Sequence, residues 1–120
     1  MTEIQNPKQY DLEERTFLFA RKVREFVRKL PKTISNIEDC SQLIRASGSQ
    51  AANYIEANEA LSKKDFLLRV RISKKETKES RLWLRLTEPK PEEENEQARL
   101  IAEANELMRI FGSILEKAKA

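Results

Sequence analysis

The sequence predicts an all-α protein with the architecture of an up-down-up-down antiparallel four-helix bundle. Four segments carry apolar residues at spacings of three and four, the period of an amphipathic helix. The 120 residues include only 2 Gly and 4 Pro, and 36% are charged, above the roughly 25% of an average globular domain. Short polar connections separate the four segments. Consecutive helices should therefore pack as neighbours within a single domain of residues 1–120.

The first helix is expected to begin near Asp11, after a polar lead-in in which Pro7 acts as a breaker. Glu13 and Glu14 would then lie in the first turn, where the helix dipole favours acidic side chains. Pro31 should end this helix near Lys29 or Leu30. Its apolar stripe is formed by Leu12, Phe19, Val23, Phe26 and Leu30.

The second helix has the start signal of a capping box, because Glu38 follows Ser35 by three residues. Gly48 lies in its middle among small residues, which favours close packing against another helix. The helix should end near Asn58, which tolerates a left-handed backbone. Its expected apolar stripe is Ile37, Cys40, Ile44, Ala51 and Ile55.

The third helix is expected over residues 63–86, with Ser62 as its N-cap. One line of residues on it should face the bundle core: Phe66, Val70, Ser73, Thr77, Ser80 and Leu84. A second line is also apolar: Leu68, Ile72, Leu82 and Leu86. Two apolar faces exceed what one bundle contact needs, so the second line predicts a subunit interface.

The fourth helix should begin near Pro91 or Glu92, after a linker broken by two prolines. Its main apolar set is Ile101, Ala104, Met108, Phe111 and Leu115. A second set lies alongside: Leu100, Leu107, Ile114 and Ala118.

The composition excludes several classes of site. The chain has no histidine and a single cysteine, Cys40, which rules out histidine-based zinc sites, Ser-His-Asp triads and an internal disulfide. We expect no metal and no cofactor. One cysteine, no apolar run of membrane-spanning length and no apolar signal core together predict a cytoplasmic protein without a membrane partner.

Basic residues form lines on two of the helices. Residues 58–88 hold nine Lys or Arg against five acids. Their candidate role is to contact nucleic-acid phosphates without sequence specificity and with strong salt dependence. The alternative is a solvated charged surface, which is the common role of such runs. The candidate contacts are Arg21, Arg24, Arg28 and Lys32 on the first helix, and Lys74, Lys75, Lys78, Arg81 and Arg85 on the third.

Two blocks in the middle of the chain, residues 42–57 and 74–84, carry spaced motifs. The first block holds Arg-Ala, spaced serines and Asn-x-x-Glu, and the second holds Glu-x-x-Glu followed by Trp-Leu. The motif residues are Arg45, Ser47, Ser49, Asn53, Glu56, Glu76, Glu79 and Trp83. With these motifs the chain resembles the 23S rRNA intervening-sequence proteins, a family related to accessory proteins of diversity-generating retroelements. The family's usual glycine after Asn-x-x-Glu is Ala57 here, so the next turn departs from the family pattern.

The resemblance implies an antiparallel four-helix bundle that assembles as a homopentameric ring. It also implies a relation to basic accessory proteins that bind RNA and a reverse transcriptase. It implies no catalytic activity, and the ribosomal part of the family name does not imply a ribosomal role.

We therefore expect a non-enzymatic oligomeric scaffold that binds structured RNA or other nucleic acid through the basic faces of the first and third helices. The alternative is a protein-interaction scaffold without a nucleic-acid role. A carboxylate site for Mg²⁺ at Glu56, Glu76 and Glu79 is less favoured than Glu–Arg pairs that fix the helix register. Asn53 and Glu56 should face the third helix, near Arg45, Glu76 or Ser80.

Overall fold

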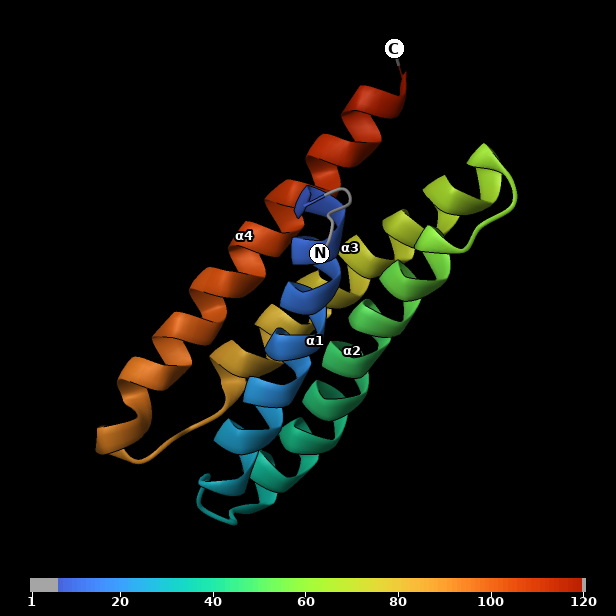
Figure 1. Ribbon diagram of the computed structural model, residues 1–120. Helices are drawn as coiled ribbons and strands as arrows, with labels where there is room; N and C mark the ends of the chain where they lie inside the picture. The colour runs from blue at the N-terminus through green and yellow to red at the C-terminus, as the bar shows by residue number, and fades with distance from the viewer. Residues whose placement is uncertain (1–6, 120) are drawn as a thin grey trace.

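The structure is a computed structural model that describes residues 7–119, and it consists of four long helices joined by short connections (Figure 1). A 3₁₀ turn, η1, precedes the last helix. The elements are α1 (Pro7–Arg28), α2 (Ile34–Asn58), α3 (Lys63–Leu86), η1 (Pro91–Glu93) and α4 (Glu94–Lys119). The predicted all-α class and four-helix bundle are confirmed for these residues.

Each helix packs on two others. α1 contacts α2 and α4, and α3 contacts the same two helices, so α1 and α3 lie at diagonal corners of the bundle. Neighbouring helices run in opposite directions (Figure 1). This antiparallel register is fixed by cross-helix contacts, since Arg45 of α2 pairs with Glu76 of α3 while Asn53, further along α2, bonds the earlier residue Arg69.

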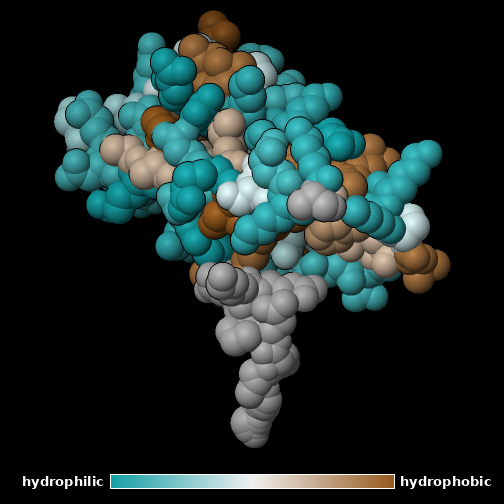
Figure 2. All heavy atoms as spheres, turned by 90° about the horizontal axis from the view of Figure 1, so that it is seen from above, coloured by the Kyte–Doolittle hydropathy of each residue, from teal (hydrophilic) through white to brown (hydrophobic). Residues whose placement is uncertain are grey.

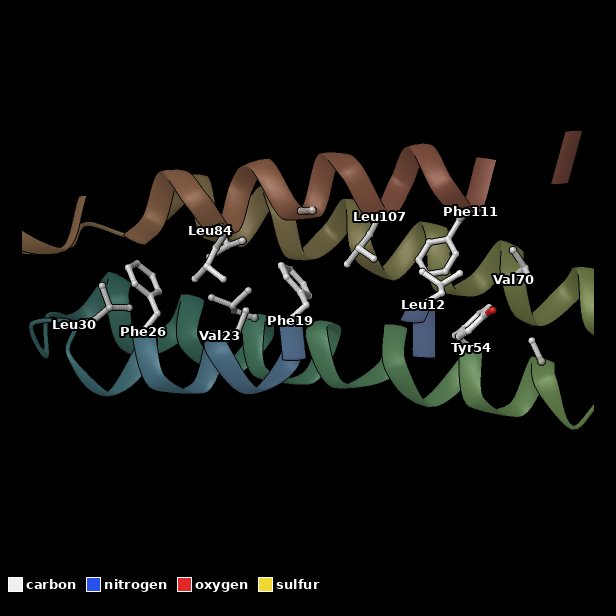
Figure 3. Packing of buried hydrophobic residues seen from close by; sticks show 14 residues of the cluster. Leu12, Phe19, Val23, Phe26, Leu30, Tyr54, Val70, Leu84, Leu107 and Phe111 are labelled. Carbon is white, nitrogen blue, oxygen red and sulfur yellow. The ribbon is translucent and has the colours of Figure 1, made fainter. Parts of the chain in front are cut away.

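The core is a column of apolar side chains along the bundle axis (Figure 3). Phe19, Val23 and Phe26 of α1 meet Leu84 of α3 at one end. At the other end the rings of Tyr54 and Phe111 lie 5.8 Å apart and are tilted by 44°. Every helix contributes side chains to this column, and their burial supplies the main driving force for folding.

The start of α1 differs from the prediction. The helix begins at Pro7 and not near Asp11, because proline at the first helical position loses no hydrogen bond and its fixed backbone angle suits the helix. Glu13 and Glu14 therefore lie beyond the first turn. The helix ends at Arg28, one or two residues before the predicted end at Lys29 or Leu30. All five predicted core residues of α1 are buried: Leu12, Phe19, Val23, Phe26 and Leu30.

The predicted capping box at the start of α2 is wrong. Thr33 is the N-cap, and its hydroxyl accepts a hydrogen bond from the Asn36 backbone N–H. The Asn36 side chain is fully buried and joins two loops, since it donates to the Pro31 and Glu88 carbonyls and accepts from the Glu88 N–H. Because α2 begins at Ile34, the predicted cap Ser35 already lies inside the helix.

The apolar stripe predicted for α2 is also largely wrong. Ile37 and Ile55 are 55% and 42% exposed, and only Ala51 of the predicted stripe is buried. The helix instead buries Asn36, Leu43, Ala46, Ser47, Gln50, Ala51, Tyr54 and Ala57. The polar members donate hydrogen bonds inside the bundle, so the helix turns a face to the core that hydropathy alone would place outside. Only the side-chain oxygen of Gln50 is buried there without a partner among the described residues.

The other end of α2 lacks the expected left-handed cap. The helix ends at Asn58 as predicted, but the C-cap is Glu59 with φ −103°, and no described non-glycine residue has a positive φ. The Asn58 side chain instead donates to Glu13 of α1.

The predicted bounds, cap and core line of α3 are confirmed, and the predictions for α4 are partly so. The Ser62 hydroxyl caps α3 by accepting from the Asp65 N–H, and the predicted core line is buried except for the half-buried Phe66. In α4, Ala104 and Phe111 are buried as predicted, but Ile101, Met108 and Leu115 are only partly so. The remaining buried residues of α4, Leu100 and Leu107, come from the second predicted set.

Candidate nucleic-acid interface

The charges of α3 are divided between two sides of the helix. α3 holds nine Lys or Arg and three acids. Glu76 and Glu79 both face α2, where they pair with Arg45 at 3.6 and 3.2 Å. The third acid, Asp65, pairs with Arg69, whose guanidinium also bonds Asn53 of α2 at 3.0 Å. All three acids of the helix are therefore engaged on its α2 side.

The side of α3 that adjoins α4 carries basic residues. The Arg81 guanidinium donates to the Asn105 side chain of α4 at 2.7 Å. The Lys74 ammonium lies over Gly112 of α4, 3.5 Å from where a Cβ would stand. We call this surface the α3 basic face, and its members are Lys63, Arg71, Lys74, Lys78, Arg81 and Arg85. None of them forms an ion pair with a described residue.

A groove of about 530 Å³ opens at one end of the α3 basic face. It lies where the start of α3 and the end of α4 diverge (Figure 1). Leu67, Gly112 and Leu115 contribute apolar and small surface to it. Four cations and one carboxylate line it: Lys63, Arg71, Lys74, Lys119 and Glu116. Its charge is therefore strongly positive.

A larger groove of about 900 Å³ runs between α1 and α4. Four cations line it, but so do four carboxylates: Arg15, Lys22, Lys29 and Arg99 with Glu25, Glu96, Glu103 and Glu106. Ion pairs cross it, with Arg15 on Glu103 at 2.8 Å and Lys29 on Glu96 at 2.6 Å. The hydrogen bond that Lys29 donates to the Glu96 carboxylate raises the pKa of Lys29. This groove is electrically balanced and offers no net attraction to phosphate.

The basic line predicted on α1 lies at the corner diagonal to α3. Its member Arg24 turns toward α2, where it approaches the Ser47 hydroxyl at 3.5 Å and the Ile44 carbonyl at 3.4 Å. Gly48 makes room for this side chain, because a Cβ there would stand 3.2 Å from the Arg24 guanidinium. The expected close packing at Gly48 is confirmed. Arg21, Arg28 and Lys32 are exposed.

Most of the motif residues lie at the contact between α2 and α3. The Asn53 amide bonds Ser49 and accepts from Arg69, while Arg45 bonds Glu79. Trp83 lies on the same side of α3 as Glu76, seven residues further along, and packs against the core cluster. Its indole N–H is buried without a hydrogen-bond partner among the described residues. The motif therefore builds a polar ladder between two helices.

Asn53 faces α3 as predicted, although its partner is Arg69 and not Arg45, Glu76 or Ser80. Two other motif residues, Glu56 and Ser47, do not lie between α2 and α3. Glu56 is exposed, so its prediction as part of a polar core is wrong. Ser47 is buried on the α1 side, near Arg24. The described residues contain no group of three His, Cys, Asp or Glu arranged to hold a metal ion.

A buried polar layer crosses the bundle, and the sequence pattern did not predict it. Gln50 is fully buried, and its amide nitrogen donates to the Thr16 and Ser47 carbonyls. The Ser73 hydroxyl of α3 donates to the Gln50 carbonyl. The layer links α1, α2 and α3, and a single polar residue between small neighbours was its only signal in the sequence.

No described helix is both long and apolar enough to cross a membrane.

Comparisons with known proteins place the chain in a family. No protein with a curated description matches the sequence. A crystal structure of a protein with unknown function from the S23 ribosomal protein family of Bacteroides thetaiotaomicron VPI-5482 matches with a TM-score of 0.72. The two are 22% identical, and the match covers 87% of this chain and 97% of that one, which shows a shared fold. The model of the 23S rRNA-intervening sequence protein family matches residues 8–113, so the chain belongs to this family.

Proposed function

We propose that this protein binds structured RNA through the α3 basic face. The observation that carries the proposal is the division of charge on α3. Its acids are engaged on the α2 side, while Lys74 and Arg81 have no acidic partner and lie against the uncharged Gly112 and Asn105 of α4. Cations without acidic partners can exchange their counterions for phosphates, and this release drives sequence-independent binding.

The shape of the surface also supports a phosphate backbone as the ligand. Residues 71–85 of a helix span about 21 Å, so the cations form a row and not a single pocket. The described part of this row lacks an exposed aromatic side chain, which is the platform on which single-stranded bases stack. The row therefore suits a helical RNA, whose backbone presents regularly spaced phosphates.

The test compares two double variants in a mobility-shift assay with an RNA hairpin. Each variant replaces two cations with glutamine. Lys74→Gln with Lys78→Gln removes two cations from the α3 basic face. Arg28→Gln with Lys32→Gln removes two from the diagonal corner. At low salt the α3 pair should weaken binding roughly tenfold or more, while the α1 pair should stay within about twofold. Absence of binding by the unmodified protein, or equal losses in both pairs, would refute the assignment.

A protein-interaction role is the second candidate, and exposed apolar side chains favour it. Ile34, Ile37, Ile55 and Phe17 are exposed by 86%, 55%, 42% and 47% along α1 and α2. Figure 2 shows hydrophobic surface emerging between the hydrophilic side chains. Exposed apolar side chains on two neighbouring helices favour self-association. The family resemblance implies that the assembly is a homopentamer.

Light scattering tests this second candidate. The unmodified protein should scatter as a homo-oligomer, and Ile37→Ser with Ile55→Ser should lower its mass toward that of the monomer. A monomeric unmodified protein would exclude the self-association role.

A further inference from the structure

The outward face of α3 carries apolar residues with a seven-residue repeat that the bundle core does not use. Six positions alternate at spacings of four and three, namely residues 68, 72, 75, 79, 82 and 86. Four of the six are apolar: Leu68, Ile72, Leu82 and Leu86. The two in the middle are charged, and of these Lys75 is exposed while Glu79 pairs with Arg45 of α2. Leu68, Leu82 and Leu86 are 48%, 46% and 50% exposed. An apolar repeat of this period is the pattern of a coiled-coil seam.

This seam points away from the protein's own core. The buried residues of α3, including Val70, Thr77 and Leu84, lie on the opposite side of the helix. α2 and α4 pack against the two flanks of α3, and α1 lies at the diagonal corner. Among the described elements, α2 reaches the seam only at Glu79, through Arg45, and leaves Leu68, Leu82 and Leu86 about half exposed.

One flank of the seam is uniformly basic. Lys64, Arg71, Lys78 and Arg85 recur at seven-residue intervals, and all four are exposed. The other flank is already engaged with α2 through Arg69 and Glu76. In a coiled coil these flanking positions contact the flanks of the partner helix and select it by charge.

We propose that the α3 seam docks an amphipathic helix of another protein, one with an apolar stripe and acidic flanks. The apolar stripe would cover the exposed leucines, and the acidic flank would neutralise the basic row. A second copy of α3 fits poorly, because an antiparallel pair would place two basic rows against each other. This proposal does not rest on RNA binding, which uses part of the same row but not the leucines.

The experiment measures binding of the full-length protein to designed peptides by fluorescence anisotropy. The probe is a helix of about four heptads with leucine in the seam and glutamate on both flanks. One control peptide carries lysine on the flanks, and another has the composition of the probe but a shuffled order. The glutamate-flanked peptide should bind, and both controls should bind at least roughly tenfold more weakly.

Protein variants separate docking from simple charge attraction. Leu68→Gln with Leu82→Gln should weaken binding of the glutamate-flanked peptide roughly a hundredfold, because two seam contacts are lost. The control, Leu61→Gln, changes a fully exposed leucine in the connection between α2 and α3 and should leave peptide affinity within about twofold. The leucine pair and the control should both bind the RNA hairpin as the unmodified protein does.

Charge reversal supplies the complementary test. Arg71→Glu with Lys78→Glu should transfer the preference to the lysine-flanked peptide. Three results would overturn the proposal. In the first, the glutamate-flanked peptide fails to bind. In the second, the variant with Leu68→Gln and Leu82→Gln binds this peptide as tightly as the unmodified protein, which would make the attraction purely electrostatic. In the third, the same variant dissociates an oligomer of the protein, which would show that a second copy covers the seam.

Discussion

Asn36→Ala should destabilise the fold more than any comparable change at the surface. The Asn36 side chain makes three hydrogen bonds, two to the Pro31 and Glu88 carbonyls at 2.9 and 3.0 Å and one from the Glu88 N–H at 2.9 Å. The residue is fully buried, so water cannot replace these contacts. At about 1 kcal/mol net for each bond, the free energy of unfolding should fall by about 3 kcal/mol.

Urea denaturation followed by circular dichroism measures this loss, and thermal unfolding should show a fall of about 12 °C at roughly 4 °C per kcal/mol. Asn95→Ala is the matched control because the Asn95 side chain is exposed, and its effect should stay within about 0.5 kcal/mol. If Asn36→Ala cost less than about 1 kcal/mol, the clamp between the two loops would not contribute as argued.

Three further changes test local features of the fold. Thr33→Ala should lower the unfolding free energy by about 1 kcal/mol and Ser35→Ala by less than about 0.5 kcal/mol, and the reverse order in urea denaturation would restore Ser35 as the cap. Gly48→Ala should change stability by less than about 1 kcal/mol, since the gain in helix propensity offsets the shift of Arg24, and a loss above about 2 kcal/mol would show that Arg24 cannot move. Burial raises the pKa of the Cys40 thiol, so alkylation near pH 7.5 should be slower than that of glutathione and should accelerate with pH; a faster reaction would contradict this protection.

The buried face of α3 was predictable and that of α2 was not, for a physical reason. Two of the three polar residues buried in α3 form local hydrogen bonds, as the Thr77 hydroxyl donates to the Ser73 carbonyl and the Ser80 hydroxyl to the Glu76 carbonyl. The third, Ser73, donates to the Gln50 carbonyl of α2. Thr77 and Ser80 can therefore follow the apolar stripe into the core. Asn36 and Gln50 of α2 depend on partners from other parts of the chain, which a local pattern cannot reveal.

The candidate interface was predictable in part. The excess of basic residues on α3 is visible in the sequence, and the diagonal placement of α1 and α3 follows from the bundle topology. The surface next to α4 is free of the acids Glu76 and Glu79 because both pair with Arg45 on the α2 side. That contact joins residues more than thirty positions apart. Helix periodicity gives the direction of each side chain but not its partner.

The salt dependence of RNA binding tests the central proposal most directly. The logarithm of the association constant for an RNA hairpin should fall linearly with the logarithm of the salt concentration. Lys74→Gln with Lys78→Gln should make that slope shallower by roughly two, about one for each phosphate contact removed. A slope that these substitutions leave unchanged, or that Arg28→Gln with Lys32→Gln reduces by the same amount, would contradict RNA binding at the α3 basic face.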